Sequence, residues 1–232
     1  MSGADDDFAA RREALSRRVG EIEARSGSRA DFFDGVYDMA GDDPSAVPWA
    51  DLKPKAELHG SLAGNPGRGG RAIDVACGLG DNAEAIAAAG YRTVAFDGSE
   101  KAIRWARERF PESDVDYRVA DLLDVPADWR GTFDLVNECY TIQSVPPDRH
   151  AAFAAAIAGL VKSGGTLLVY MRRRDEGSEA SGPPWPLMPS ELEIFSTMGF
   201  ERVAHRPFAL NRPDRTIPIV FDVWRRNGAE VA

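Results

Sequence analysis

Hydrophobic residues in the first part of the chain repeat at helical spacing. Apolar positions three to seven residues apart, set among Arg and Glu, predict an amphipathic helix over Asp5–Arg25, with Phe8, Leu15, Val19 and Ile22 on its apolar face. Two shorter helices are predicted over Asp31–Met39 and Pro54–Leu62. Gly and Pro residues between them, over Gly41–Trp49, predict a loop.

After residue 70 the pattern changes, and short apolar runs alternate with helical segments. We expect strands at Arg71–Ala76, Tyr91–Phe96, Val115–Ala120, Phe133–Asn137 and Gly165–Met171. We expect helices at Asn82–Ala89, Ser99–Phe110, Pro147–Val161 and Glu191–Met198. Such alternation predicts parallel strands joined by right-handed crossovers. Two final apolar runs, Phe200–Phe208 and Ile217–Trp224, are separated only by a turn and predict an antiparallel hairpin at the sheet edge. The fold class is therefore α/β, a doubly wound, mostly parallel seven-stranded sheet with an antiparallel last strand.

Composition and charge narrow the function. The 232 residues include 28 Lys and Arg against 37 Asp and Glu, a net charge of −9. This charge disfavours nucleic acid and anionic membranes as partners, because the mean field repels phosphate. Two cysteines and three scattered histidines form neither a disulfide framework nor a zinc motif, so we expect no metal. The acidic N-terminus lacks the pattern of a signal peptide, and the longest apolar stretch, Ala151–Val161, is too short to span a bilayer. We expect a cytoplasmic protein, a monomer or homodimer.

The chemistry is concentrated in a strand, a glycine turn and a helix over Ala72–Ala83. Gly78 and Gly80 allow the backbone to pass close to a ligand, and the helix N-terminus adds N–H donors. Asp97 ends the next strand, where a carboxylate can accept hydrogen bonds from both ribose hydroxyls of an adenosine. In an open parallel sheet both segments lie at the carboxyl edge, where ligands bind.

Two ligand classes compete for this geometry. The pattern Gly78-x-Gly80-x-x-Ala83 also matches the dinucleotide fingerprint. However, Asp74 and Asp81 flank the turn, and two carboxylates repel a pyrophosphate. They suit S-adenosylmethionine, which carries an ammonium and a sulfonium.

Taken together, these motifs resemble the class I S-adenosylmethionine-dependent methyltransferases. The family's acidic-x-x-x-Gly-x-Gly motif is matched by Asp74, Gly78 and Gly80, and its later acidic residues by Asp97 and Asp121. The strand Phe133–Val136 resembles the fourth motif and Gly164–Tyr170 the fifth, so the resemblance covers about residues 71–172. The resemblance implies S-adenosylmethionine as cofactor, S-adenosylhomocysteine as product, and a cofactor-binding set of Trp49, Asp74, Ala76, Gly78, Gly80, Asn82, Asp97, Gly98, Ser99, Asp121, Leu122, Asn137 and Glu138.

The N-terminal part resembles the opening of small-molecule methyltransferases of the thiopurine, thiol and halide type. The resemblance lies in Phe32–Tyr37 and in the Pro-Trp pair that ends at Trp49. In that group the tryptophan packs near the methionine end of the cofactor, and the alternative is that Trp49 anchors a loop to the core. We expect residues 1–64 to be a helical extension that caps the active site and residues 65–232 to be the cofactor-binding methyltransferase domain.

Candidate catalytic residues are Glu138, Tyr140 and His205. Glu138 can orient a substrate or act as a base if burial raises its pKa, or it can simply hold a loop. Tyr140 can stack on an aromatic acceptor or cover the cofactor, and His205 lies in the expected edge strand. Gln143 and Arg172 are weaker candidates, and Arg172–Pro186 has the length of a lid loop.

The predicted function is methyl transfer from S-adenosylmethionine to a small molecule through a thiol, a heterocyclic nitrogen or a hydroxyl. Two alternatives remain: an NAD(P)-dependent oxidoreductase, and a non-catalytic module that only binds the cofactor.

Overall fold

The computed structural model describes residues 14–15, 17–212 and 215–228. Within that range residues 14–15 and 17–25 are helical, as the N-terminal pattern predicts. The beginning of that predicted helix, with Phe8, lies outside the described residues.

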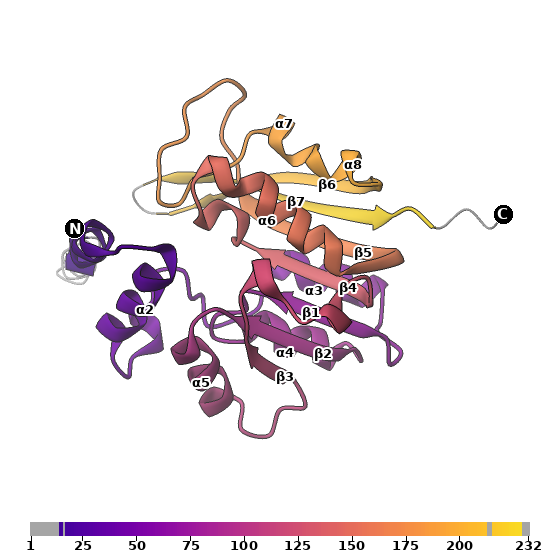
Figure 1. The fold of residues 1–232 in the computed structure, drawn as a ribbon, viewed down its shortest axis with the longest axis horizontal. Coiled ribbons are helices and arrows are strands. Elements are labelled where there is room, and N and C mark those ends of the chain that lie inside the picture. The colour runs from indigo at the N-terminus through magenta and orange to yellow at the C-terminus, as the bar shows by residue number, and fades with distance from the viewer. Residues whose placement is uncertain (1–13, 16, 213–214, 229–232) are drawn as a thin grey trace.

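A single seven-stranded sheet organises the described chain (Figure 1). Its strands are β1 (Arg71–Val75), β2 (Arg92–Asp97), β3 (Asp116–Val119), β4 (Phe133–Cys139), β5 (Val161–Arg172), β6 (Phe200–Asn211) and β7 (Thr216–Arg226). They lie in the order β3-β2-β1-β4-β5-β7-β6. The first five pair in parallel, whereas β7 runs antiparallel to both β5 and β6. The predicted doubly wound sheet and the antiparallel edge hairpin are therefore confirmed.

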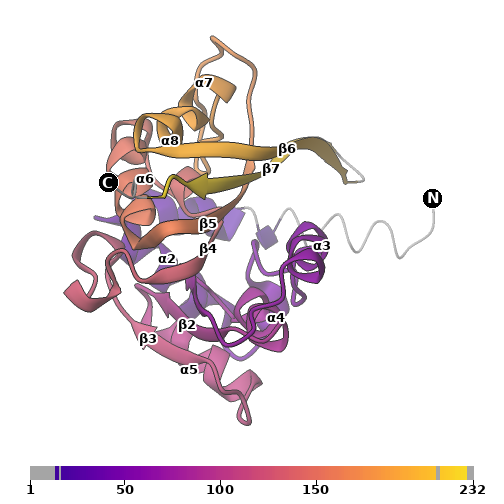
Figure 2. The same ribbon diagram turned by 90° about the vertical axis from the view of Figure 1, so that its right-hand side faces the viewer.

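Helices cover both faces of the sheet (Figures 1 and 2). They are α2 (Arg29–Ala40), α3 (Ala56–Gly64), α4 (Asp81–Ala88), α5 (Glu100–Arg109), α6 (Pro147–Leu160), α7 (Pro189–Leu192) and α8 (Ile194–Thr197). The apolar side chains of α6, α7 and α8 join one large core with alternate residues of β4, β5 and β7. Those of α3 and α4 pack on the opposite face, and α5 joins α4 over β2 and β3. Figure 1 shows α2 beyond the carboxyl ends of the parallel strands, next to the edge where ligands bind in this architecture.

Two predicted elements differ from the structure. The helix expected over Glu191–Met198 is two short helices, α7 and α8, which are separated at Glu193, with φ −65° and ψ −7°. The first of them begins early, since Pro189 occupies its first position, where a missing N–H costs nothing. The fifth strand starts at Val161 rather than Gly165, and it pairs there with Phe133 of β4.

Candidate functional site

The glycine turn after β1 has an unusual backbone. Ala76, Gly78 and Gly80 all have positive φ, at 49°, 54° and 90°. Gly80 also faces Tyr117 of β3, and a Cβ at Gly80 would lie 2.4 Å from the Tyr117 hydroxyl oxygen. Any side chain there would clash, so Gly80 is required for packing as well as for conformation. A Cβ at Gly78 would meet only the Tyr37 hydroxyl, at 3.6 Å, so its positive φ is what favours glycine.

Asp97, at the end of β2, is hydrogen bonded to this turn. The Gly78 N–H donates to its Oδ2 at 3.0 Å, and the Ser99 N–H donates to its Oδ1 at 2.9 Å. Burial raises the pKa of Asp97, and these backbone donors oppose that shift. Each carboxylate oxygen has a second lone pair. Asp97 therefore joins the ends of β1 and β2 and keeps acceptor capacity for a ligand.

Asp74 lies in β1, opposite Asn137 in the β1–β4 register. Its side chain is buried, and its Oδ1 accepts a 2.7 Å hydrogen bond from Asn137 Nδ2. Its Oδ2 is buried without a hydrogen-bond partner among the described residues. Burial raises the pKa of Asp74 to about 7, and the nearby Asp97 carboxylate adds to the rise.

Glu138, the next residue of β4, is fully buried. Its Oε1 accepts hydrogen bonds from the N–H groups of Thr141 and Ile142, at 2.6 and 3.1 Å. Glu138 therefore holds the turn after β4, which is one of the roles expected from the sequence. Its Oε2, like that of Asp74, is buried and has no partner in the described structure, and burial raises its pKa to about 7.

The structure corrects the role predicted for Asp81 as a carboxylate facing a positively charged ligand. Asp81 begins α4, but Arg109 of α5 pairs with both of its oxygens, at 2.7 and 2.8 Å. The same guanidinium donates to the Leu79 carbonyl at 2.6 Å. A bidentate pair of this kind neutralises the carboxylate locally. Asp81 therefore fastens α5 to the glycine turn, whereas Asp74, Asp97 and Glu138 have no cationic partner among the described residues.

Three further predicted cofactor residues lie along the β2 and β3 ends. Asp121 is exposed and accepts from the Leu123 N–H at 2.9 Å, so it caps the short 3-10 helix η2 (Leu122–Asp124). Leu122 is buried, whereas Gly98 is exposed with open space around its Cα. These positions border the same edge of the sheet as Asp97.

The N-terminal segment reaches this edge through specific contacts. Asp34 of α2 accepts a 2.6 Å hydrogen bond from the Ser99 hydroxyl, which also caps α5. Trp49 donates through Nε1 to the Tyr37 hydroxyl at 3.3 Å, and its ring meets those of Phe33 and Tyr37 edge-on. Asp34 and Tyr37 were not expected as site residues, although both lie in the segment Phe32–Tyr37, which resembles the opening of small-molecule methyltransferases.

A group of side chains lies at the ends of β4 and β5. Tyr140 follows β4 with φ 67°, and its ring meets that of Tyr170 edge-on at 5.2 Å. The Lys55 Nζ lies 4.7 Å from the Tyr140 ring centroid, and the Lys55 N–H donates to Asn82 Oδ1 at 3.1 Å. The predicted residues Asn82 and Tyr140 thus come together through Lys55, a residue with no recognisable sequence motif.

His205 is placed elsewhere. It lies on the edge strand β6, and its Nδ1 is 2.7 Å from Oδ1 of the buried Asp222. The described contacts do not connect His205 with the residues at the ends of β1, β2 and β4. Its catalytic role stays a prediction.

Neither a membrane-spanning helix nor a metal site is found within the described ranges. Residues 14–15, 17–212 and 215–228 contain no helix long and apolar enough to cross a bilayer. In the same ranges, no group of three or more His, Cys, Asp or Glu side chains is placed to hold a metal ion.

Comparison with known proteins gives the site a context. Residues 72–165 match the family described as "Methyltransferase domain". A curated relative named ubiquinone biosynthesis O-methyltransferase, from Xanthomonas campestris pv. campestris, is 38% identical over 108 residues, covering 46% of this chain and 44% of the relative. A protein of the same name from Thiobacillus denitrificans is 40% identical over 115 residues, 49% of each chain. The chain thus spans about half the length of the curated relatives it matches.

A solved structure shares the fold at low sequence identity. The structure of Burkholderia thailandensis 1,6-didemethyltoxoflavin-N1-methyltransferase, with its substrate and S-adenosylhomocysteine bound, aligns with a TM-score of 0.67. It is 18% identical, and the alignment covers 86% of this chain and 87% of that one. At this identity the likeness concerns the fold, and it confirms the predicted doubly wound, mostly parallel sheet.

Proposed function

We propose that this chain, whose residues 72–165 match the family described as "Methyltransferase domain", is a class I S-adenosylmethionine-dependent methyltransferase that transfers a methyl group to a small-molecule acceptor. The acceptor atom is a thiol sulfur, a heterocyclic nitrogen or a hydroxyl oxygen. The names of the compared proteins, O-methyltransferases of ubiquinone biosynthesis and a toxoflavin N1-methyltransferase, support a small acceptor.

One observation carries the proposal: two buried carboxylates at adjoining strand ends each leave one oxygen without a hydrogen-bond partner in the part of the chain that the structure describes. These atoms are Asp74 Oδ2 and Glu138 Oε2. Burying a carboxylate costs free energy unless a donor or a positive charge compensates it. A ligand with an ammonium and a sulfonium supplies such charge, whereas the pyrophosphate of a dinucleotide adds to the repulsion. The residues present therefore fit S-adenosylmethionine better than NAD(P).

Other residues of the chain would hold the rest of the cofactor. Asp97 would accept hydrogen bonds from the ribose hydroxyls, because its two oxygens keep lone pairs beyond those used by Gly78 and Ser99. Asp121 and Leu122 would border the adenine, as the family resemblance implies. Trp49, held by Tyr37, would cover the methionine end. In this arrangement α2 and the segment up to Trp49 would form the cap expected of residues 1–64, whereas α3, at the end of that range, packs on the sheet of the domain formed by residues 65–232.

The chemical demand on the protein is modest. When bound, S-adenosylmethionine supplies an electrophilic methyl group on a positively charged sulfur. The chain has to align the acceptor with that methyl group and exclude water from the site. Tyr140 would position the acceptor at the end of β4. For a hydroxyl acceptor, Glu138, with its pKa of about 7, would receive the proton.

Two measurements test the proposal. Calorimetric titration should show that S-adenosylhomocysteine binds and that NADH and NADPH do not, and thermal unfolding should show the matching stabilisation. Release of S-adenosylhomocysteine should then be measured over thiols, phenols and N-heterocycles. Binding of NAD(P)H in place of the adenosyl ligand would refute the proposal. Tight binding without turnover on any acceptor would instead favour a non-catalytic binding module.

A further inference from the structure

Positive side chains gather around Tyr140 at the ends of β4 and β5. The Lys55 Nζ lies 4.7 Å from the Tyr140 ring centroid and 5.3 Å from that of Tyr170. The Arg172 guanidinium carbon lies 5.9 Å from the same Tyr140 centroid. Two cations therefore approach one tyrosine ring at the strand ends where the proposed methyl acceptor would lie.

The β6–β7 hairpin brings more positive charge to this place. Arg212 lies 3.6 Å from Asp51, and Asp51 also pairs with Lys55 at 2.5 Å. The Asp51 carboxylate therefore pairs with both Lys55 and Arg212. Burial lowers the pKa of Arg172, and the nearby Arg215 and Arg212 lower it further, whereas Tyr140 opposes the shift. Glu57 is a second carboxylate near this group, on the side of Tyr170.

Within the described residues, the Tyr140 side chain gives Arg172 some compensation, but no carboxylate does. In the part of the chain that the structure describes, no Asp or Glu oxygen lies within 4.0 Å of its guanidinium, and its buried Nε has no hydrogen-bond partner. Its main-chain N–H is engaged, donating to Gln143 Oε1 at 2.6 Å. The whole chain carries a net charge of −9. A local cluster of positive side chains around the half-buried Arg172 is therefore not explained by the overall composition. A guanidinium in such a place is stabilised when an anion reaches it.

The group is also connected to the cofactor side of the site. The Lys55 N–H donates to Asn82 in the first turn of α4, directly after the glycine turn. Tyr140 follows Glu138 by two residues, and its N–H donates to the Tyr170 carbonyl at 2.9 Å. Aromatic rings line the group, since Tyr170 contacts both Tyr140 and Phe208 edge-on.

From these contacts we propose that the methyl acceptor is an aromatic acid, whose carboxylate binds Arg172 and Lys55 and whose ring packs against Tyr140. This inference rests on the proposed methyl transfer and adds the charge of the substrate to it. A neutral acceptor of the same shape would leave the cations as they are, and it would therefore bind more weakly.

Matched acid and amide probes test the proposal with one probe pair for each acceptor atom. The pairs are 4-hydroxybenzoate and 4-hydroxybenzamide, 4-mercaptobenzoate and 4-mercaptobenzamide, and imidazole-4-carboxylate and its amide. Binding to the full chain saturated with S-adenosylhomocysteine is measured by calorimetry, and methyl transfer is measured with S-adenosylmethionine. We expect at least one acid to bind roughly tenfold or more tightly than its amide, as a charge-assisted pair requires.

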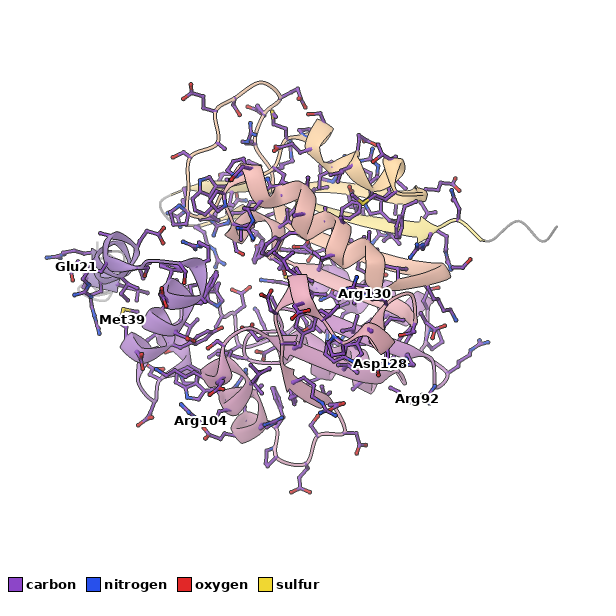
Figure 3. All side chains as sticks on the ribbon, in the orientation of Figure 1. Glu21, Met39, Arg92, Arg104, Asp128 and Arg130 are labelled. Carbon is purple, nitrogen blue, oxygen red and sulfur yellow. The ribbon has the colours of Figure 1, made fainter. Side chains whose placement is uncertain are left out.

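Variants of the arginines near Tyr140 test whether these side chains cause the preference for the acid over the amide. Arg172→Gln should remove most of the acid preference while leaving the affinity for the amide within about twofold, and Arg172→Lys should restore part of the preference. Arg104→Gln is the matched control, because it makes the same change in net charge at an exposed position on α5 (Figure 3). Unfolding curves and S-adenosylhomocysteine affinity of each variant show whether the fold and the cofactor side are intact. A second cluster variant, Arg212→Gln at the exposed hairpin, should weaken the preference less.

The outcomes separate the two proposals. Equal affinity for acids and amides, no binding by any of the three acids, or an acid preference that survives Arg172→Gln in a folded protein overturns the aromatic-acid proposal. Failure of S-adenosylhomocysteine itself to bind overturns the proposed function instead.

Discussion

Replacing Asp97 by asparagine tests whether this carboxylate binds the cofactor. The wild-type carboxylate accepts one backbone N–H on each oxygen, from Gly78 at 3.0 Å and from Ser99 at 2.9 Å. Asparagine keeps one acceptor oxygen and turns an NH₂ group toward the other N–H. Leaving one such donor unsatisfied costs about 1–3 kcal/mol of folding free energy. Part of that cost is offset, because burial raises the pKa of Asp97 and the neutral amide avoids the desolvation behind that shift. We expect a net loss of roughly 1 kcal/mol in the unfolding free energy of the ligand-free protein.

The loss in cofactor affinity should be larger than the loss in stability. Hydrogen bonds to a charged acceptor contribute about 1.5–3 kcal/mol, so losing the ribose contacts should weaken S-adenosylhomocysteine binding by roughly 10- to 100-fold. Calorimetric titration gives the affinity, and urea unfolding of the free protein gives the stability. Asp116→Asn, at an exposed position on the neighbouring strand β3, should change neither quantity by a measurable amount. A destabilised Asp97→Asn protein with unchanged affinity would refute the reasoning, because Asp97 would then only fasten the glycine turn to β2.

Three further predictions follow from single contacts. Gly80→Ala should destabilise the protein by more than about 2 kcal/mol in urea unfolding, because φ is 90° and the new Cβ would lie 2.4 Å from the Tyr117 hydroxyl oxygen. Ser99→Ala should cost about 1–2 kcal/mol, because it removes the cap of α5 and the hydrogen bond to Asp34; a loss below the error of the measurement would contradict this. Burial raises the pKa of Glu138 from 4.5 to about 7, so the folded state binds its proton more tightly than the unfolded state, and this group's contribution to the unfolding free energy should fall as pH rises from about 4.5 to 7. Glu138→Gln should flatten that dependence in unfolding curves taken from pH 5 to 8, and an unchanged slope would show that Glu138 titrates normally.

The alternation of strands and helices could be predicted because its determinants are local. Apolar runs bounded by glycine predict β1 and β2, and Ser99 predicts the start of α5, where it is the cap. A local pattern is less informative where one apolar segment forms two elements, as it does in α7 and α8. The break at Glu193 lies between Leu192 and Phe195, which are both buried in the large core. No periodicity in eight residues reveals such a break.

The residues of the site likewise fall into those that could be predicted from local sequence and those that could not. Asp74 and Asp97 could be placed at the carboxyl edge, because the end of a predicted strand fixes where its last side chains lie. Lys55 could not, because only the three-dimensional structure brings it to Tyr140 and Asn82. A role near a ligand therefore follows from sequence only for residues that strand order places there.

Asp81 shows how this limit bears on function. Its position in the first turn of α4 made it a candidate partner for a positively charged ligand, but Arg109, 28 residues later, takes both of its oxygens. The preference for a cationic adenosyl donor then rests on the buried carboxylates of Asp74 and Glu138, neither of which has a basic partner among the described residues. Because those two groups titrate near pH 7, the affinity for the donor should increase as they ionise. These carboxylates disfavour an anionic acceptor near the donor unless cations hold it, and Arg172 and Lys55, both beside the Tyr140 ring, provide such cations.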